Sequence, residues 1–282
     1  MDQPAFALPD HRLVALHGRD ALAFAQAQFM GDIDALADHQ WQWSGWLTPK
    51  GRVVALFALL RVDAESAWLV LHDADPVEFA QRLQRYVFRS KLSIDVRDDL
   101  RVDGAFDARP AAAGATAAPV GDGFALDFGG AGGARTLRVG APGTSPADAE
   151  AAARWAVFDL AHGLPRLPPS QAEQWTPQQL SLDRLRAYSV KKGCYPGQEI
   201  VARTHFLGQA KRGLVLFEAD APLAAGAQVM DGERAAGTIV SVADAGQRHR
   251  ALAVLPLDQA IAVPVVDGRP LRRLALLDGL AR

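Results

Sequence analysis

The chain has 282 residues, 49% of them hydrophobic, so it is long enough to bury more than one core. Its 30 basic and 32 acidic residues give a formal net charge of -2, which excludes a protein-wide positive field for nucleic acid or an anionic membrane. The single cysteine, Cys194, excludes an intramolecular disulfide and a four-thiolate metal site. The first residues lack the order of a signal peptide, and no apolar run approaches the ~20 residues that span a bilayer. We therefore expect a cytoplasmic protein without membrane contact.

The first 107 residues alternate strand-like and helix-like patterns. Residues 12–17 predict a strand, and Asp20 is placed to cap an apolar helix that runs to about residue 29. Asp75 and Pro76 open a second, amphipathic helix, over about 77–89. The remaining strand patterns cover 41–48, 53–61, 67–72 and 91–96. The order βαβββαβ predicts a ferredoxin-like α+β domain over residues 1–107.

Residues 108–207 form a connecting α+β region. Small residues dominate 108–122, which we interpret as a flexible connection, and a glycine-rich cluster separates strands expected over 124–128 and 136–139. A helix is expected after Pro146, ending at Gly163.

The region 208–282 has an all-β pattern. Short strands are expected over 214–217, 237–242, 251–255 and 271–276, separated by Gly, Pro and Asp turns. This pattern predicts a small C-terminal β-barrel, so the overall fold class is α+β.

Cys194 lies in the most informative stretch of the chain, residues 191–203. Residues 195–198 fit a type II β-turn, because Pro196 presets φ at the second position and Gly197 accepts the positive φ of the third. Neighbouring lysines and the start of a following helix favour the thiolate over the thiol, which predicts a nucleophile, a metal ligand or a redox group. A small buried hydrophobic residue is the alternative, because unpaired cysteines are often buried.

The stretch Lys-Gly-Cys-Tyr-Pro-Gly-Gln-Glu-Ile-Val-Ala-Arg at 192–203 resembles the K-G-C-Y-x-G-Q-E signature of the YgfZ family. Further matching segments follow the family's order at 16–21, 49–52, 86–91 and 163–165, so that only the region around 108–134 matches poorly. The resemblance implies the fold of the glycine-cleavage T-protein, with ferredoxin-like modules and a C-terminal small β-barrel around a central opening.

The same resemblance implies a folate-binding-type accessory protein. Such a protein would support assembly, maintenance or repair of iron–sulfur clusters in client enzymes, with indirect effects on tRNA modification. Its expected partners are iron–sulfur client enzymes or cluster-assembly factors, and its expected cofactor is tetrahydrofolate or a derivative. Cys194 is the expected functional thiol. The residues expected at the cofactor site are Trp155, Lys192, Tyr195, Gln198, Glu199 and Arg203.

Several positions depart from the family or T-protein pattern. His11 stands where the family has a second tryptophan, and Ala161 replaces an acidic residue, with Asp159 displaced from that position by two residues. Ala55 lies where T-protein-like transferases carry an Asp-Asp pair. Trp155 could stack on a pterin or be an ordinary core residue, and its sequence context does not decide between them.

Two other functions stay open: a tetrahydrofolate-dependent aminomethyl or one-carbon transferase, and a folate-independent interaction factor that uses Cys194. The missing carboxylates count against the transferase, because a positioned acid or base often contributes ~100- to 10,000-fold in rate. Direct tRNA binding is not expected, since the charge is near neutral and no aromatic-rich basic motif occurs. No metal site is expected either, because the seven histidines lack zinc-like spacing with Cys or acidic residues.

Overall fold

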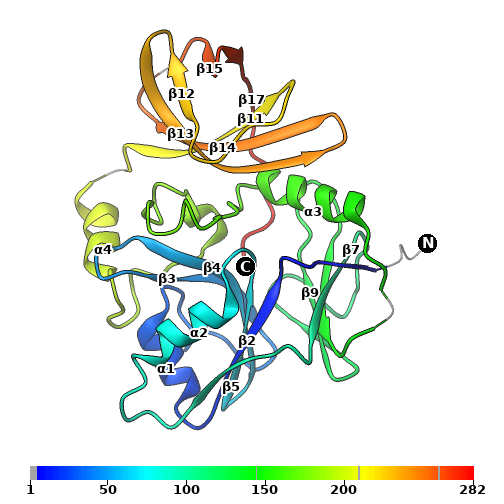
Figure 1. The fold of residues 1–282 in the computed structure, drawn as a ribbon. Coiled ribbons are helices and arrows are strands. Elements are labelled where there is room, and N and C mark those ends of the chain that lie inside the picture. The colour runs from blue at the N-terminus through cyan, green and yellow to red at the C-terminus, as the bar shows by residue number, and fades with distance from the viewer. Residues whose placement is uncertain (1–4, 144, 209, 260) are drawn as a thin grey trace.

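Three β-sheets and four α-helices form the molecule (Figure 1). The computed structural model describes residues 5–143, 145–208, 210–259 and 261–282, and the counts here refer to those residues. Two five-stranded sheets pack against each other through a shared core, and a seven-stranded sheet lies at one end of the pair. None of the helices in these ranges is both long and apolar enough to cross a bilayer.

The elements of the first sheet and its two helices follow the predicted ferredoxin-like order βαβββαβ along the chain. Its strands are antiparallel in the spatial order β3-β4-β5-β2-β6, and they run over β2 (Arg12–His17), β3 (Trp41–Leu47), β4 (Val53–Asp63), β5 (Ser66–Leu71) and β6 (Ser93–Val96). Helices α1 (Ala21–Gln28) and α2 (Pro76–Gln84) pack on one face, and the second sheet packs on the other. This explains the uniformly apolar sequence of β4, since both of its faces are buried.

Two details of this sheet differ from the prediction. Asp20 precedes α1 as expected, but its side chain caps no helix amide and instead accepts a hydrogen bond from the backbone N–H of Lys91 at 2.7 Å. The second helix ends at Gln84 rather than near residue 89. Tyr86 continues the apolar periodicity but lies beyond the helix, where its ring packs edge-on against Trp46 of β3.

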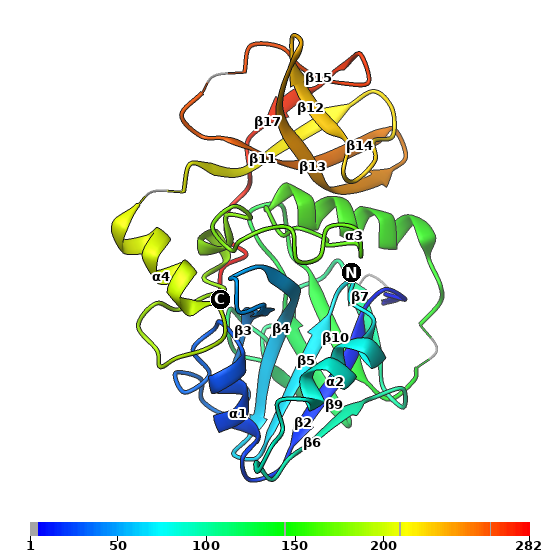
Figure 2. The ribbon, with the colours of Figure 1, turned by 60° about the vertical axis from the view of Figure 1, so that its left-hand side comes forward.

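The second sheet has the antiparallel order β1-β7-β10-β9-β8. Its strands are β1 (Phe6–Ala7), β7 (Arg101–Ala105), β8 (Ala118–Val120), β9 (Gly123–Asp127) and β10 (Thr136–Gly140). Helix α3 (Ala149–Ala161) lies between this sheet and the seven-stranded sheet (Figure 2) and begins after a capping Asp148. It ends at Ala161, two residues before the predicted end at Gly163, which has φ 73°. Strands β1 and β7 both lie within residues 1–107, the expected first domain, yet they pair in this second sheet. The division into three domains stays a prediction.

The expectation of a flexible connection over 108–122 was wrong. Part of this segment is β8, and the backbone N–H groups of Trp41 and Ala117 donate to the carbonyls of Ala115 and His39. Small side chains do pack here, since Ala112, Ala117 and Ala118 are all buried. The segment therefore joins the two five-stranded sheets firmly.

The C-terminal sheet is the predicted small barrel, nearly closed on itself (Figure 2). Its order is β16-β15-β12-β13-β14-β11-β17, and its strands are β11 (Arg212–Ala219), β12 (Gln228–Asp231), β13 (Arg234–Ala245), β14 (Arg248–Pro256), β15 (Pro264–Val266), β16 (Arg269–Pro270) and β17 (Arg272–Leu274). The link from α3 to the barrel contains a short 3-10 helix (Leu182–Leu185) and α4 (Gln198–Leu207).

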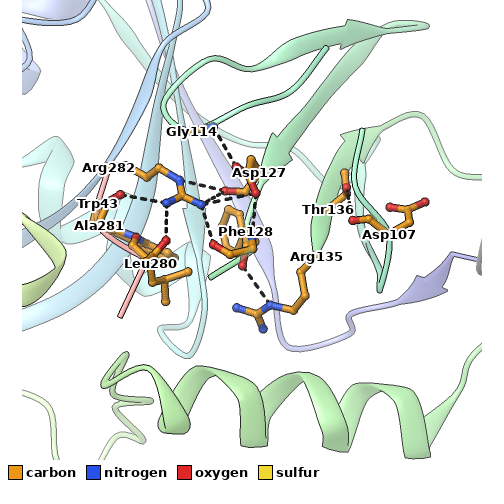
Figure 3. A network of polar contacts seen from close by, with 12 residues as sticks. Trp43, Asp107, Gly114, Asp127, Phe128, Arg135, Thr136, Leu280, Ala281 and Arg282 are labelled. Atoms are coloured by element: carbon orange, nitrogen blue, oxygen red, sulfur yellow. Dashed lines mark hydrogen bonds and ion pairs between the residues drawn. The ribbon is translucent and has the colours of Figure 1, made fainter. Parts of the chain in front are cut away.

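The segment 277–282 returns from the barrel to the centre of the molecule (Figures 1 and 3). The indole N–H of Trp43 donates to the carbonyl of Leu280 at 2.7 Å, and the Leu280 side chain is buried. The guanidinium of Arg282 donates to the carbonyls of Asp127 at 2.6 Å and Gly129 at 2.8 Å. This segment therefore closes the region where the two five-stranded sheets meet.

Candidate functional site

The signature turn has the predicted type II geometry. Gly197 has φ 79° and ψ 0°, and the backbone N–H of Gln198 donates to the carbonyl of Tyr195 at 3.1 Å. The turn packs directly on the 48–51 turn of the first sheet. A Cβ at Gly197 would lie 2.6 Å from the Thr48 carbonyl oxygen and 2.7 Å from the Gly51 Cα, so only glycine fits both the backbone conformation and the space.

Lys192 ties the signature stretch to the end of α1. Its side chain is buried, and Nζ donates to the carbonyls of Phe29 and Gly31, each at 2.6 Å. Burial lowers the pKa of Lys192 to about 8, and the nearby charges of Asp32 and Asp34 partly oppose that shift. The ammonium group is thus committed to backbone carbonyls within the protein.

Tyr195 and Gln198 hold the same turn from the other side. The Tyr195 hydroxyl donates to the carbonyl of Ser189 at 3.0 Å, and the amide of Gln198 donates to the carbonyl of Lys192 at 3.1 Å. Burial raises the pKa of Tyr195, so its hydroxyl stays protonated and able to donate. Both side chains act on the conformation of the turn.

Cys194 is exposed on this stiffly held turn, which excludes the alternative of a buried core residue. Its neighbour Gly193 faces open space, since an added Cβ would meet no atom within 4 Å. Glu199 and Arg203 are also exposed, on α4. Across the described ranges, no three His, Cys, Asp or Glu side chains converge on a point that would hold a metal ion. Cys194 is therefore presented to solvent as a single thiol.

Trp155 lies in the core, with 1% of its surface exposed. Its ring packs against Phe6 and Phe128, and the Arg135 guanidinium lies 4.0 Å from its ring centroid. Arg135 is itself buried, and its Nη1 lies 2.8 Å from a carboxylate oxygen of Asp159. Trp155 thus belongs to a buried cluster that combines aromatic rings with an ion pair.

Two buried histidines belong to the same cluster, His11 beside Trp155 and His72 beside His11, and their ring nitrogens have no hydrogen-bond partner among the described residues. The ring centroids of His11 and His72 lie 5.0 Å apart, and His11 lies 6.5 Å from Trp155. The indole nitrogen of Trp155 also lacks a partner. Burial holds the pKa of both histidines well below 6.5, so both rings are neutral. Unpaired buried polar groups of this kind each cost ~1–3 kcal/mol, so a ligand or water that paired these nitrogens would stabilise the cluster.

The predicted site residues fall into two separate places. Lys192, Tyr195 and Gln198 surround the turn of Cys194 at the 47–48 end of β3. Trp155 instead packs on Phe128, which also packs on Trp43, roughly 16 Å back along that strand. Sequence reasoning missed His72 and Arg135. The available signals were weak: a histidine after an apolar strand, and an arginine after a glycine run.

The fold and this signature turn define a protein of the aminomethyltransferase T class of folds. The structure superposes on the glycine cleavage system aminomethyltransferase T from Bartonella henselae with a TM-score of 0.77, covering 96% of this chain and 85% of that one at 16% identity. That likeness shows the fold alone.

The sequence comparisons define the family. The chain is 30% identical over 226 residues to the tRNA-modifying protein YgfZ of Klebsiella pneumoniae, covering 73% of this chain and 69% of that protein. It is 27% identical to the tRNA-modifying protein YgfZ of Aliivibrio fischeri, covering 89% and 84%. It is also 28% identical to an uncharacterized protein of Haemophilus influenzae, covering 75% and 72%. No protein-family model matches the chain. The chain belongs to the YgfZ family.

Proposed function

We propose that this protein is an accessory factor that supports assembly, maintenance or repair of iron–sulfur clusters in client enzymes, binds a reduced folate, and affects tRNA modification indirectly. The observation that carries the proposal is the position of Cys194. Lys192, Tyr195 and Gln198 hold the turn through hydrogen bonds to its backbone or to the end of α1, whereas the Cys194 thiol is exposed. This arrangement suits a thiol that acts on a partner or on cluster iron rather than on a substrate enclosed by this chain.

The folate part of the proposal is supported by the unpartnered nitrogens around Trp155. A pterin is flat and has hydrogen-bond donors and acceptors along its edge, which match His11, His72 and the Trp155 indole N–H. A bound tetrahydrofolate would supply one-carbon carrier chemistry. The protein's own part would be to orient the ring, exclude water and pair these nitrogens, whose desolvation is otherwise uncompensated.

The positions where T-protein-like transferases carry acidic residues disfavour a transferase. Ala55 and Ala161 are buried and carry no proton-transfer group. Asp159, the displaced acid, is 0% exposed and is paired with Arg135, so it cannot replace the carboxylate absent at position 161. General acid–base help at a transferring nitrogen is therefore missing at these positions.

Replacement of Cys194 tests the main proposal. In a strain that lacks the native protein, Cys194→Ala is expected to abolish the rescue of a cluster-dependent enzyme activity, and Cys194→Ser tests whether a hydroxyl can substitute. Gly193→Ala is the matched control, because it changes a neighbouring exposed position with open space around it. Full rescue by Cys194→Ala at equal protein abundance would remove the thiol from the function.

Tetrahydrofolate titration followed by tryptophan fluorescence tests the folate proposal. The chain has six tryptophans, so Trp155→Phe is compared with Trp175→Phe, whose indole is bonded to Gln171 elsewhere in the structure. Quenching is expected in the wild type and in Trp175→Phe, and a smaller response in Trp155→Phe. Calorimetric titration of both variants confirms that the signal reports binding. Equal affinity in all three proteins would exclude Trp155 from the folate site.

A further inference from the structure

A cavity of about 660 Å³ lies between α3 and the β13–β14 hairpin of the barrel. Val157, Phe158 and Ala161 of α3 form one wall, and the hairpin contributes Ala245, Gly246, Arg248 and Arg250. Figures 1 and 2 both show α3 directly against the barrel at this level. A cavity of this size is in the range of roughly 300–1,000 Å³ that small-molecule sites occupy.

This cavity is separate from both clusters described above. Trp155 and Asp159 of α3 are turned into the core, with 1% and 0% of their surfaces exposed, and neither lines the cavity. The signature stretch 192–203 contributes no lining residue. The proposed role of Cys194 therefore makes no use of this space.

The lining is strongly basic. Arg154, Arg248 and Arg250 all line it, whereas Glu150 is its one acidic side chain. Of these three arginines, Arg250 forms an ion pair with Glu218 at 3.0 Å, whereas Arg154 and Arg248 form none within the described residues. Burial lowers the pKa of Arg250, and the positive charge of Arg248 lowers it further. The arrangement brings three arginine side chains to one cavity, and one of them is already paired with Glu218.

The cavity also has a planar guanidinium group and an apolar wall. The guanidinium of Arg154 lies 4.4 Å from the ring centroid of Phe106, which fixes a planar donor group beside the cavity. Val157, Ala161 and Leu277 supply apolar surface. His162 contributes no free polar atom, because its two ring nitrogens are engaged with the Phe158 carbonyl and the Gly132 N–H. Polar recognition in this cavity thus depends on the arginines.

We propose that this cavity binds a small aromatic anion, a flat ring that carries a phosphate or carboxylate group. The ring packs against the apolar wall of α3, and the anionic group pairs with Arg154, Arg248 and Arg250. Guanidinium groups recognise both anions through paired N–H bonds, so the chemistry is shared by the two ligand types. This site is independent of the proposed function, whose tests depend on Cys194 and Trp155.

Calorimetric titration with three probes tests the site. Adenosine 5′-monophosphate represents an aromatic phosphate, isophthalate an aromatic dicarboxylate, and adenosine the uncharged comparison. At least one anion is expected to bind with a Kd of about 1 mM or tighter, and adenosine at least ~10-fold more weakly than adenosine 5′-monophosphate if the phosphate is the group recognised. Preference between the two anions identifies which source of negative charge the site accepts.

The double variant Arg154→Gln/Arg248→Gln locates the binding. Both arginines are exposed, so the variant is expected to keep the wild-type unfolding temperature. Its affinity for the bound anion is expected to fall at least 10-fold. Arg269→Gln, an exposed arginine of β16 outside the lining, is the matched control and should bind as the wild type does. Failure of both anions to bind, or equal affinity in the double variant, would overturn the proposal.

Discussion

Replacement of Gly197 by alanine tests whether the signature turn is held rigidly against the first sheet. Alanine at φ 79° costs ~1–2 kcal/mol for the left-handed backbone alone. Its Cβ would also lie 2.6 Å and 2.7 Å from backbone atoms of Thr48 and Gly51, which cannot move aside as a flexible side chain does. Overpacking of this kind typically costs a further ~1–3 kcal/mol. Together these effects predict a loss of ~2–5 kcal/mol in the free energy of folding the turn.

Gly193→Ala provides the comparison within the same turn. Gly193 lacks a positive φ, and an added Cβ meets nothing within 4 Å, so a change below about 0.5 kcal/mol is expected. Urea unfolding measures the global effect of each variant. Because a surface segment can open without global unfolding, hydrogen exchange of residues 192–201 is measured as well.

The two measurements together decide the prediction. Gly197→Ala should lower the unfolding midpoint, accelerate exchange across 192–201, or do both, while Gly193→Ala should do neither. Cys194 should then be less well positioned, and rescue of the cluster-dependent activity should fall in Gly197→Ala. If both variants unfold at the wild-type midpoint and exchange at the wild-type rate, the turn is not held rigidly against the first sheet.

Three further predictions follow from buried polar groups. The pKa of Lys192 is lowered from 10.5 to about 8, so between these pH values the unfolded chain binds more protons than the folded chain. The free energy of unfolding of the wild type should therefore rise by about 2 kcal/mol relative to that of Lys192→Met between pH 7 and pH 9.5, as measured by urea titration. Lys191→Met, at an exposed position, should show the same rise in stability with pH as the wild type. A stability difference between wild type and Lys192→Met that does not change with pH would contradict the prediction. Arg135→Met leaves the Asp159 charge buried and should cost ~3–5 kcal/mol, whereas Arg135→Met/Asp159→Leu should cost less; equal losses in chemical denaturation would show that the pair is not coupled. Arg282→Ala should speed hydrogen exchange in residues 277–282, and unchanged exchange would mean that Arg282 does not hold this segment.

Local sequence patterns predicted much of the fold. The apolar run of β4 identified a central strand, and Asp75 before Pro76 correctly marked the start of α2, where its carboxylate accepts the Glu78 N–H. Pro196 and Gly197 predicted the type II turn. These signals succeed because φ preferences, capping and periodicity act over a few residues.

The errors arose where distant residues override those preferences. The helix pattern continues to residue 89, but the helix ends at Gln84 and Tyr86 packs on Trp46 of the neighbouring sheet instead. The small residues of 108–122 looked unable to pack, but they pair with residues 39–41. The expected folate contacts of Lys192, Tyr195, Gln198, Glu199, Arg203 and Trp155 stay predictions.

The sequence by itself determined that Cys194 lies in a stiff turn before a helix, since that depends on residues 195–198 alone. Tertiary structure decided that the thiol is exposed while Lys192 is buried against the carbonyls of Phe29 and Gly31. It likewise placed Trp155 in one cluster with His11 and His72 and opened a cavity lined by arginines on another face of α3. The physical reason is that burial and pairing depend on segments more than 100 residues apart in the chain, whose contacts form only when the sheets pack together.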